Sequence, residues 1–306
     1  MSVAPASGSP TYDAIVIGGG PAGLSAALIL GRCRRRILVC DAGQPRNAPS
    51  AAMHGFLTRD GIAPLEFLRL AREELAQYGV EVLVRPVVEA AATPGGFEVV
   101  LSDGRRVTCR KLLLATGVVD RLPDVEGAKE MYGRSLFHCP YCDGWESRDQ
   151  PLAVYGSDHG AVGLALGLKT WSRDVVLCTG GGRLAAEGAD RLSRNGVSIR
   201  REKVLRFEGN DGRLERVVFA GGEPLERRVL FFHSGAHQRS SLADRLGCEF
   251  DRRGAVRTNR FEGTRVPGLY VAGDASDDVQ LVVVAAAEGA KAGFAINAAL
   301  QKEDLE

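Results

Sequence analysis

A glycine-rich loop near the start of the chain, Gly18–Gly23, restricts the possible folds more than any other feature of the sequence. It follows a short β-rich run at Tyr12–Ile17 and precedes a run of small residues at 21–32 that reads as a helix. The G-x-G-x-x-G pattern lets backbone amides approach a pyrophosphate at the positive end of a helix. Asp41 closes the next β-rich run about twenty residues later, where a carboxylate accepts hydrogen bonds from ribose hydroxyls. The cofactor-binding residues predicted here are Gly18, Gly20, Pro21, Ala22, Gly23 and Asp41. The alternative is a glycine turn that binds nothing.

The order of strand, glycine turn and helix recurs in the second half of the chain, from a strand at 152–155 and a turn at Gly156. Internal duplication explains this repeat better than one oversized sheet. The Ala-rich helix expected at 281–300 is too small-sided to stand alone, so we expect it to pack on the first unit. The predicted fold class is therefore α/β, with two Rossmann-like three-layer domains, the second inserted into the first. The expected boundaries are 1–117 with 236–306 for the first domain, and 118–235 for the second.

The composition excludes several classes of partner. Lysine and arginine (39) nearly balance aspartate and glutamate (38), so we expect no field that favours nucleic acid or an anionic membrane. The N-terminal eleven residues lack the basic and apolar regions of a secretory signal, and we see no uninterrupted apolar run that could span a bilayer. We therefore expect a soluble, cytoplasmic protein. Five of the seven cysteines are scattered through apolar or helical settings and are expected to be reduced and mostly buried.

The other two cysteines stand in Cys139-Pro140-Tyr141-Cys142, a spacing at which two thiols can close into a disulfide and reopen. The first alternative is that these cysteines are half of a zinc site. The sequence has no second such pair, and His138 alone does not complete a set of four ligands, so we predict no metal. The second alternative is that both cysteines are core residues with no redox role. Pro140, Asp143 and Gly144 place them on a turn, however, where other molecules can reach the thiols. Asp143 is ordinarily a solvated or capping carboxylate. With a raised pKa, it could protonate a departing thiolate.

Two further segments favour FAD over NAD as the ligand of the first unit. Ala115-Thr116-Gly117 ends a predicted strand, and Gly273-Asp274 ends another. FAD is long enough to need contacts from several chain segments, although either segment alone is an ordinary strand end.

The glycine loop of the second unit stands at the position in the fold where a nicotinamide nucleotide would bind, but its residues do not suit that ligand. Asp158 stands where the second glycine belongs, so its Cβ obstructs the backbone and its charge repels pyrophosphate. The next strand ends in Thr179-Gly180-Gly181, which offers neither an acid for a ribose nor an arginine pair for a phosphate. We expect NAD(P)H to bind weakly, if it binds.

With these motifs taken together, the chain resembles the low-molecular-weight, two-domain thioredoxin reductases and their relatives along nearly all of its length. Gly18–Gly23, Ala115–Gly117, Cys139–Gly144 and Gly273-Asp274 match that family in order and approximate spacing. The resemblance implies that Cys142 faces the flavin, that Cys139 attacks the external disulfide, that Asp143 is the proton donor, and that the enzyme is a homodimer.

The sequence also resembles a branch of this family, the dithiol oxidases, which close disulfides in small sulfur compounds and pass electrons from FAD to oxygen. Thr179-Gly180-Gly181 replaces the histidine and two arginines with which the reductases hold NADPH. Those oxidases commonly have histidine directly after the second cysteine, where this chain has Asp143. Residues in segments that resemble the oxidase branch, and that we predict to contact the flavin, are Arg46, Asn47, His54, Gln280 and Leu281.

The sequence thus predicts an FAD-dependent dithiol/disulfide oxidoreductase in which Cys139 and Cys142 exchange two electrons with the flavin. The catalytic candidates are Cys139, Cys142, Asp143 and His138. A thioredoxin-like protein or a small dithiol or disulfide is the expected partner. Two alternatives remain open: an oxidase that needs no NADPH, and a non-catalytic flavoprotein whose dithiol senses redox state.

Overall fold

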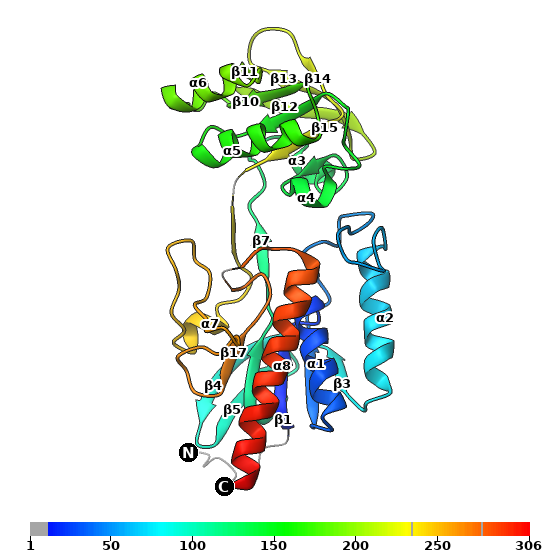
Figure 1. Ribbon diagram of the computed structural model, residues 1–306, viewed down its shortest axis with the longest axis vertical. Helices are drawn as coiled ribbons and strands as arrows, with labels where there is room; N and C mark the ends of the chain where they lie inside the picture. The colour runs from blue at the N-terminus through cyan, green and yellow to red at the C-terminus, as the bar shows by residue number, and fades with distance from the viewer. Residues whose placement is uncertain (1–11, 234, 277) are drawn as a thin grey trace. The chain divides into compact units, whose positions relative to one another are not determined.

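The computed structural model describes residues 12–233, 235–276 and 278–306, which form two compact units (Figure 1). Unit 1 contains the chain up to Arg46 and residues 65–119 and 237–306, and unit 2 contains 47–64 and 120–236. The segment 47–64, which we assigned to the first domain, belongs to unit 2. The reason is packing: a Cβ at Gly133 would lie 2.7 Å from the Pro49 side chain. Residues 1–11, on which the expectation about a secretory signal depends, lie outside the described residues.

Unit 1 is built on a seven-stranded sheet in the order β3-β2-β1-β6-β5-β4, with β17 also paired to β6. Its strands are β1 (Tyr12–Ile17), β2 (Ile37–Asp41), β3 (Glu81–Val84), β4 (Val87–Thr93), β5 (Gly96–Leu101), β6 (Arg106–Leu114) and β17 (Leu269–Val271). Its helices are α1 (Pro21–Arg32), α2 (Pro64–Ala76), α7 (Leu242–Arg245) and α8 (Val282–Leu305). From the sequence alone, residues 97–109 read as a hairpin around Asp103-Gly104 and residues 112–115 as a separate buried strand. In the structure β6 serves both, pairing antiparallel with β5 at its start and parallel with β1 and β17 at its end.

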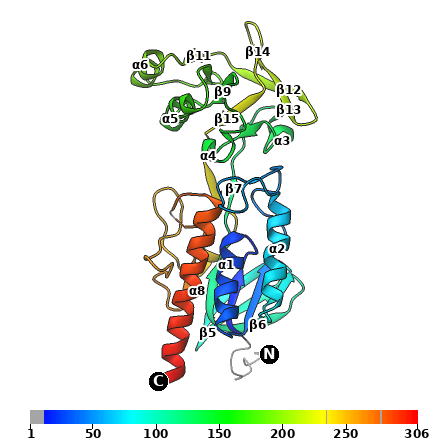
Figure 2. The same cartoon turned by 45° about the vertical axis from the view of Figure 1, so that its right-hand side comes forward.

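The sheet of unit 1 has apolar side chains on both faces, because successive residues of a strand point to opposite sides. Ala14 and Val16 of β1 pack in the cluster that includes α1, α2 and α8, whereas Ile15 and Ile17 pack in the cluster on the other face. Figure 2 shows these three helices on one side of the sheet. The two faces account for the continuous apolar character of β1 and β2.

Helix α8 packs closely along α1, as both ribbon views show (Figures 1 and 2). A Cβ at Gly289 would lie 1.9 Å from the Ala22 carbonyl oxygen, and a Cβ at Gly293 would lie 2.9 Å from that of Ala26. By length and composition alone α8 also meets the test for a membrane-spanning helix, although Glu288 and Lys291 interrupt its apolar residues. Its small residues, spaced by four, explain this apolar character through contact with α1.

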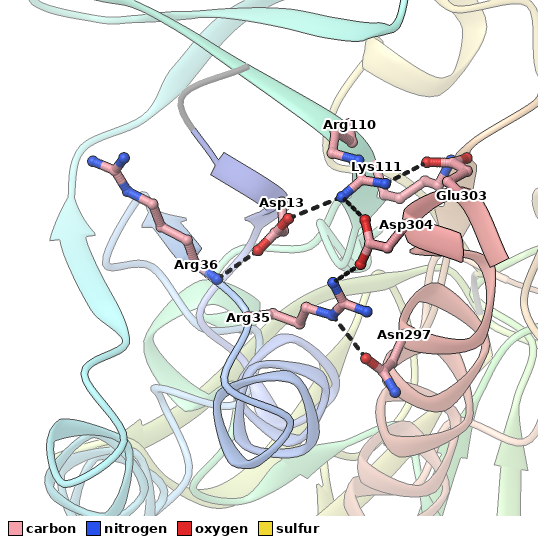
Figure 3. Close-up of polar contacts among 8 residues, drawn as sticks. All are labelled: Asp13, Arg35, Arg36, Arg110, Lys111, Asn297, Glu303 and Asp304. Carbon is pink, nitrogen blue, oxygen red and sulfur yellow. Dashed lines mark hydrogen bonds and ion pairs between the residues drawn. The ribbon is translucent and has the colours of Figure 1, made fainter. Parts of the chain in front are cut away.

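The C-terminal end of α8 is held by a polar cluster (Figure 3). Asp304 pairs with Arg35 at 2.5 Å and with Arg110 at 2.7 Å, and Glu303 pairs with Arg110 at 3.0 Å and with Lys111. Acidic groups are unfavourable at the negative end of a helix dipole. These ion pairs offset that effect and fasten α8 to β6 and to the turn after α1.

Unit 2 contains a parallel sheet in the order β11-β10-β9-β15-β8 and an antiparallel sheet β12-β13-β14. Its strands are β8 (Leu136–Phe137), β9 (Leu152–Tyr155), β10 (Val175–Cys178), β11 (Ser198–Arg200), β12 (Val204–Asn210), β13 (Arg213–Phe219), β14 (Leu225–Glu226) and β15 (Val229–Phe232). Its helices are α3 (Ala128–Met131), α4 (Pro140–Asp143), α5 (His159–Gly167), the 3₁₀ turn Leu168–Thr170 and α6 (Ala186–Arg194). The connecting segments pair as strands β7 (Val118–Asp120) and β16 (Ala236–Gln238). The α/β class with two Rossmann-like units is confirmed.

Candidate functional site

The glycine loop of unit 1 joins β1 to α1 in a conformation that side chains would prevent. Gly18 has a φ of 116°, and a Cβ there would lie 2.1 Å from the Ala115 carbonyl oxygen. A Cβ at Gly23 would lie 1.9 Å from the Gly18 carbonyl oxygen. Two of the three motif glycines are therefore required by the backbone of the protein itself.

The start of α1 is available to a ligand. Gly20 is the N-cap residue, Pro21 follows it, and no side chain among the described residues caps the helix. A Cβ at Gly20 would meet nothing within 4 Å in the described part of the chain. Because the first N–H groups of a helix lack partners and carry partial positive charge, this end suits a pyrophosphate.

Asp41 lies beside the same loop. It ends β2 with 8 % of its surface exposed, and a Cβ at Gly19 would lie 2.6 Å from its carboxyl group. Its Oδ2 accepts a hydrogen bond from Arg72 Nη2 at 2.6 Å. The sequence did not predict Arg72, because the contact joins β2 to α2 across 31 residues. The structure thus brings the Asp41 carboxylate next to the glycine loop, as the sequence predicts.

Three other predicted residues of unit 1 meet at a second point. Arg46 Nη1 lies 2.7 Å from Asp274 Oδ2 and donates to Gln280 Oε1 at 2.8 Å. Leu281 is the N-cap residue of α8. The start of α8, the end of β17 and the chain after β2 are therefore tied together, as a cofactor that contacts several segments requires.

The other predicted flavin contacts divide between the units. The Ala115 N–H donates to the Ile17 carbonyl at 2.8 Å, Thr116 follows it, and Gly117 has a φ of 65°. Asn47 and His54 lie in unit 2, so the structure does not place them with the others.

The residues of unit 1 fit FAD by the shape of the backbone. The loop takes its conformation because Gly18 and Gly23 have no Cβ atoms, a Cβ at Gly20 would project into the space beside the loop, and the start of α1 is left for an anion. Asp41 and the Arg46–Asp274 pair lie on segments that would hold the rest of the cofactor.

Cys139 and Cys142 form a disulfide at the start of the short helix α4 in unit 2. The N–H groups of Cys142 and Asp143 both lie 3.2 Å from the Cys139 carbonyl oxygen. A Cβ at Gly144 would lie 2.8 Å from the Trp171 ring, so only glycine lets the turn close against that ring. Both cysteines are partly exposed, so the dithiol spacing seen in the sequence becomes an accessible, rigidly held disulfide.

Asp143 has the property that the sequence-based hypothesis required. Burial and, to a smaller extent, the negative charge of Glu146 raise the pKa of Asp143 to about 7, while His54 acts in the opposite direction. A carboxyl group with this pKa exists in both protonation states near neutral pH, as a proton donor and acceptor needs.

The two histidines singled out in the sequence have separate surroundings. His138 Nε2 lies 3.9 Å from Asp120 Oδ1, and Asp120 accepts a hydrogen bond from the Tyr132 hydroxyl at 2.6 Å. His54 lies between Asp60 and Glu146, at 3.5 and 3.6 Å. His54 thus affects Asp143 through its charge, a contact that the sequence did not predict. Across 12–233, 235–276 and 278–306, no cluster of His, Cys, Asp or Glu could hold a metal.

The second glycine loop is closed by its own side chains. Asp158 is the N-cap of α5 and accepts a hydrogen bond from the Ala161 N–H at 2.8 Å. The other carboxylate oxygen lies 3.1 Å from His233 Nδ1. A Cβ at Gly160 would lie 2.1 Å from the His233 ring, which therefore covers the first turn of the helix. A carboxylate and an imidazole ring therefore lie at the start of α5.

Thr179 and Gly180, at the end of β10, pack against other segments of unit 2. The Thr179 side chain is buried and donates to the Arg201 carbonyl, and a Cβ at Gly180 would lie 2.8 Å from the Tyr155 ring. Arg200 pairs with Glu202 at 2.9 Å.

The structure also shows a buried carboxylate that we did not predict, Glu288 of α8. Its Oε2 accepts a hydrogen bond from the Gly273 N–H at 2.6 Å, and only 4 % of the residue is exposed. The one signal in the sequence is an acid within an otherwise apolar stretch of helix.

Comparisons with known proteins agree with this geometry. The family model described as pyridine nucleotide-disulphide oxidoreductase matches residues 12–289. A protein named as a probable thioredoxin reductase from Arthroderma benhamiae is 34% identical, over 87% of this chain and 74% of its own. The crystal structure of HlmI has a TM-score of 0.92 at 41% identity, covering 96% of this chain and 94% of its own. TrxB from Bacillus anthracis has a TM-score of 0.91 at 35% identity, covering 96% and 99%.

Proposed function

Since this chain belongs to the pyridine nucleotide-disulphide oxidoreductase family and is a flavin-dependent disulfide oxidoreductase, we propose that it works as a dithiol oxidase. In this proposal the protein closes the disulfide of a small dithiol, uses FAD and oxygen as acceptors, and draws no electrons from NAD(P)H.

The observation that carries this proposal is the contrast between the starts of two equivalent helices. Among the described residues, no side chain caps α1, which leaves its first N–H groups for a pyrophosphate. The start of α5 is capped by Asp158 and covered by His233. A dinucleotide at α5 would have to displace a carboxylate of its own charge, so one of the two nucleotide loops supports binding and the other opposes it.

The disulfide supplies the reacting atoms of the protein. A substrate thiolate attacks Cys139 Sγ, the bond between Cys139 and Cys142 breaks, and Cys142 leaves as a thiolate. The second substrate thiolate attacks the substrate sulfur of the mixed disulfide, which closes the product disulfide and releases Cys139. FAD, when bound, supplies the two-electron acceptor that restores the Cys139–Cys142 disulfide and passes electrons to oxygen, so that dithiol and O₂ give disulfide and hydrogen peroxide.

Asp143 moves the proton in this scheme. Its carboxyl group directly follows Cys142, and its pKa of about 7 lets it protonate the departing Cys142 thiolate and recover that proton later. Gly18, Gly20, Gly23 and Asp41 would hold the adenosine diphosphate part of FAD. Arg46 and Asp274 would contact the remainder.

The test is anaerobic mixing of the flavin-loaded protein with dithiothreitol, NADPH or NADH while the visible flavin absorption is recorded. We expect dithiothreitol to bleach the flavin and either nucleotide to leave it unchanged over the same time. Admission of air should then restore the colour and yield hydrogen peroxide. Rapid bleaching by NADPH would overturn the proposal.

A second candidate is a disulfide reductase that acts on a thioredoxin-like protein. The name of the Arthroderma benhamiae relative favours it, and so does Asp143, because the chain lacks the histidine of the oxidases at that position. The same mixing experiment separates the two, since a reductase needs a donor that reaches its flavin from outside.

A further inference from the structure

Glu288 is a buried acid that the proposed chemistry leaves without a role. It is the only charged residue from Leu281 to Ala290, and it lies in α8 with 4 % of its surface exposed. A buried carboxylate is costly unless hydrogen bonds satisfy it. Its contacts therefore indicate what it does.

Those contacts are made by one turn, the segment that follows β17. The Gly273 N–H donates to Glu288 Oε2 at 2.6 Å, and the Ser276 hydroxyl lies 2.8 Å from the same oxygen. The Ser276 N–H donates to the Gly273 carbonyl at 2.8 Å, which closes the turn on itself. One carboxylate oxygen thus binds both ends of the turn.

The turn also packs closely against α1. Gly273 has a φ of 78°, and a Cβ there would lie 2.9 Å from the Ala22 side chain, one residue after Pro21 of the glycine loop. Glu288 holds this turn from α8 while Ala22 limits it from the other side. Asp274, the next residue, is therefore fixed in place.

We propose that Glu288 is a positioning residue for the flavin: it fixes the turn at 273–276 so that Asp274 meets Arg46 at the cofactor site of unit 1. The Asp274–Arg46 distance of 2.7 Å and the Arg46 contact with Gln280 depend on where this turn lies. The inference rests on the FAD site proposed above and not on the direction of electron flow.

The charges around Glu288 are consistent with this role. Burial raises its pKa to about 7, and Glu262 and Asp278 raise it as well, while the bonds from Ser276 and Gly273 act in the opposite direction. Lys291, one turn further along α8, pairs with Glu262. The neutral form of Glu288 is thus accessible near neutral pH, and a glutamine should reproduce its acceptor oxygen.

The test compares FAD binding by apoproteins, measured by fluorescence titration, with thermal unfolding of the same apoproteins. We expect Glu288→Met to raise the Kd for FAD by at least about tenfold and Ser276→Ala by a smaller factor. Glu288→Gln should stay within about threefold of wild type, because it keeps the acceptor. Lys291→Met is the control: it unpairs Glu262 and lowers the unfolding temperature without touching the turn, so its Kd should be unchanged.

Four results would overturn parts of this account. Wild-type affinity in Glu288→Met refutes the positioning role. Equal losses of affinity in Glu288→Met and Lys291→Met mean that general destabilisation explains both. If Glu288→Met does not fold, the other two variants decide. The inference is wrong if Ser276→Ala binds FAD as tightly as wild type does, or if Glu288→Gln loses its affinity for FAD. If the wild-type apoprotein takes up no FAD, the FAD site proposed above is itself wrong.

Discussion

The Asp158 carboxylate accepts a hydrogen bond from the Ala161 N–H at 2.8 Å, so the first turn of α5 is closed by a side chain of the same loop. An N-cap aspartate stabilises the start of a helix. In the proposed function the same carboxylate also opposes nucleotide binding, because a dinucleotide at the start of this helix would bring phosphates of like charge next to it.

Replacing Asp158 with glycine should make NADPH a better donor to the flavin. The change removes a like charge and a Cβ from the loop, and we expect the anaerobic bleaching rate with NADPH to rise about tenfold. Glycine is a tolerated N-cap, so stability should fall by only a few tenths of a kcal/mol, roughly. Asp158→Asn is the control, because it removes the charge and keeps the cap. An unchanged bleaching rate in Asp158→Gly would show that this loop does not limit NADPH use.

Replacing Asp143 with asparagine should slow the reaction of the enzyme disulfide with dithiols by about 10²-fold or more. The donor must be protonated, and Asp143 has a pKa of about 7, so the wild-type rate, divided by the fraction of the dithiol present as thiolate, should fall as pH rises through 7. The variant should lack that inflection in stopped-flow traces at different pH values. Glu146→Gln should move the inflection to lower pH, because the Glu146 charge raises the pKa of Asp143. If the inflection persists in Asp143→Asn, a group other than Asp143 causes it.

Replacing Cys139 or Cys142 with serine should abolish dithiol turnover, because either change removes the disulfide that accepts the substrate electrons. Oxygen uptake with dithiothreitol measures this loss. Cys33 is a free, exposed cysteine and provides the matched control, so Cys33→Ser should retain the wild-type rate. Loss of activity in all three variants would point to non-specific damage.

Alanine at two glycines of the same loop should have different effects. Gly23→Ala forces a Cβ against the Gly18 carbonyl oxygen, so we expect a loss of about 1–3 kcal/mol in stability together with FAD binding. Gly20→Ala places a Cβ where the described residues leave space, so the apoprotein should unfold nearly as wild type does. Its Kd for FAD should still rise, because the methyl group lies where the pyrophosphate would approach. Chemical unfolding and FAD titration of both apoproteins would check this, and equal affinities in wild type and Gly20→Ala contradict it.

Glutamine at position 288 should make the protein relatively more stable at high pH. The pKa of Glu288 is about 7 in the folded protein against an ordinary value of 4.5, so the folded state binds more protons between these values. Wild-type stability therefore falls as pH rises through this window, and the unfavourable contribution is complete above pH 7. Between pH 5 and pH 8 the free energy of unfolding of wild type should fall by about 1–3 kcal/mol relative to that of Glu288→Gln. This is less than the complete pKa shift would give, because the carboxyl group is partly hydrated. Urea unfolding of both apoproteins measures it, and parallel pH curves would be inconsistent with a buried titration.

The local features of the fold were predictable from the sequence. The strand Tyr12–Ile17 and the helix Pro21–Arg32 have the bounds expected, because a buried strand, a glycine loop and an N1 proline are all signals within a few residues. The Cys139–Cys142 pair was likewise visible as a spacing.

The remaining features depend on contacts between residues distant in the chain. The strand β6 was divided in two because its partners change along its length from β5 to β1 and β17. The segment 47–64 was assigned to the wrong unit because its contact with Gly133 leaves no local pattern. Arg72 and Glu288 were missed for the same reason, since each binds a segment from another part of the chain.

The ion pairs of Glu303 and Asp304 bear on how the protein should be prepared for study. Helix α8 begins at Val282, so Asp304 lies about 33 Å along the helix axis from its first residue. A purification tag fused directly after Glu306 would lie close to the ion pairs that Asp304 makes with Arg35 and Arg110. Breaking these pairs would free the C-terminal end of α8 and so disturb the position of the whole helix. Fusions at the other terminus are the better choice for any measurement of flavin content.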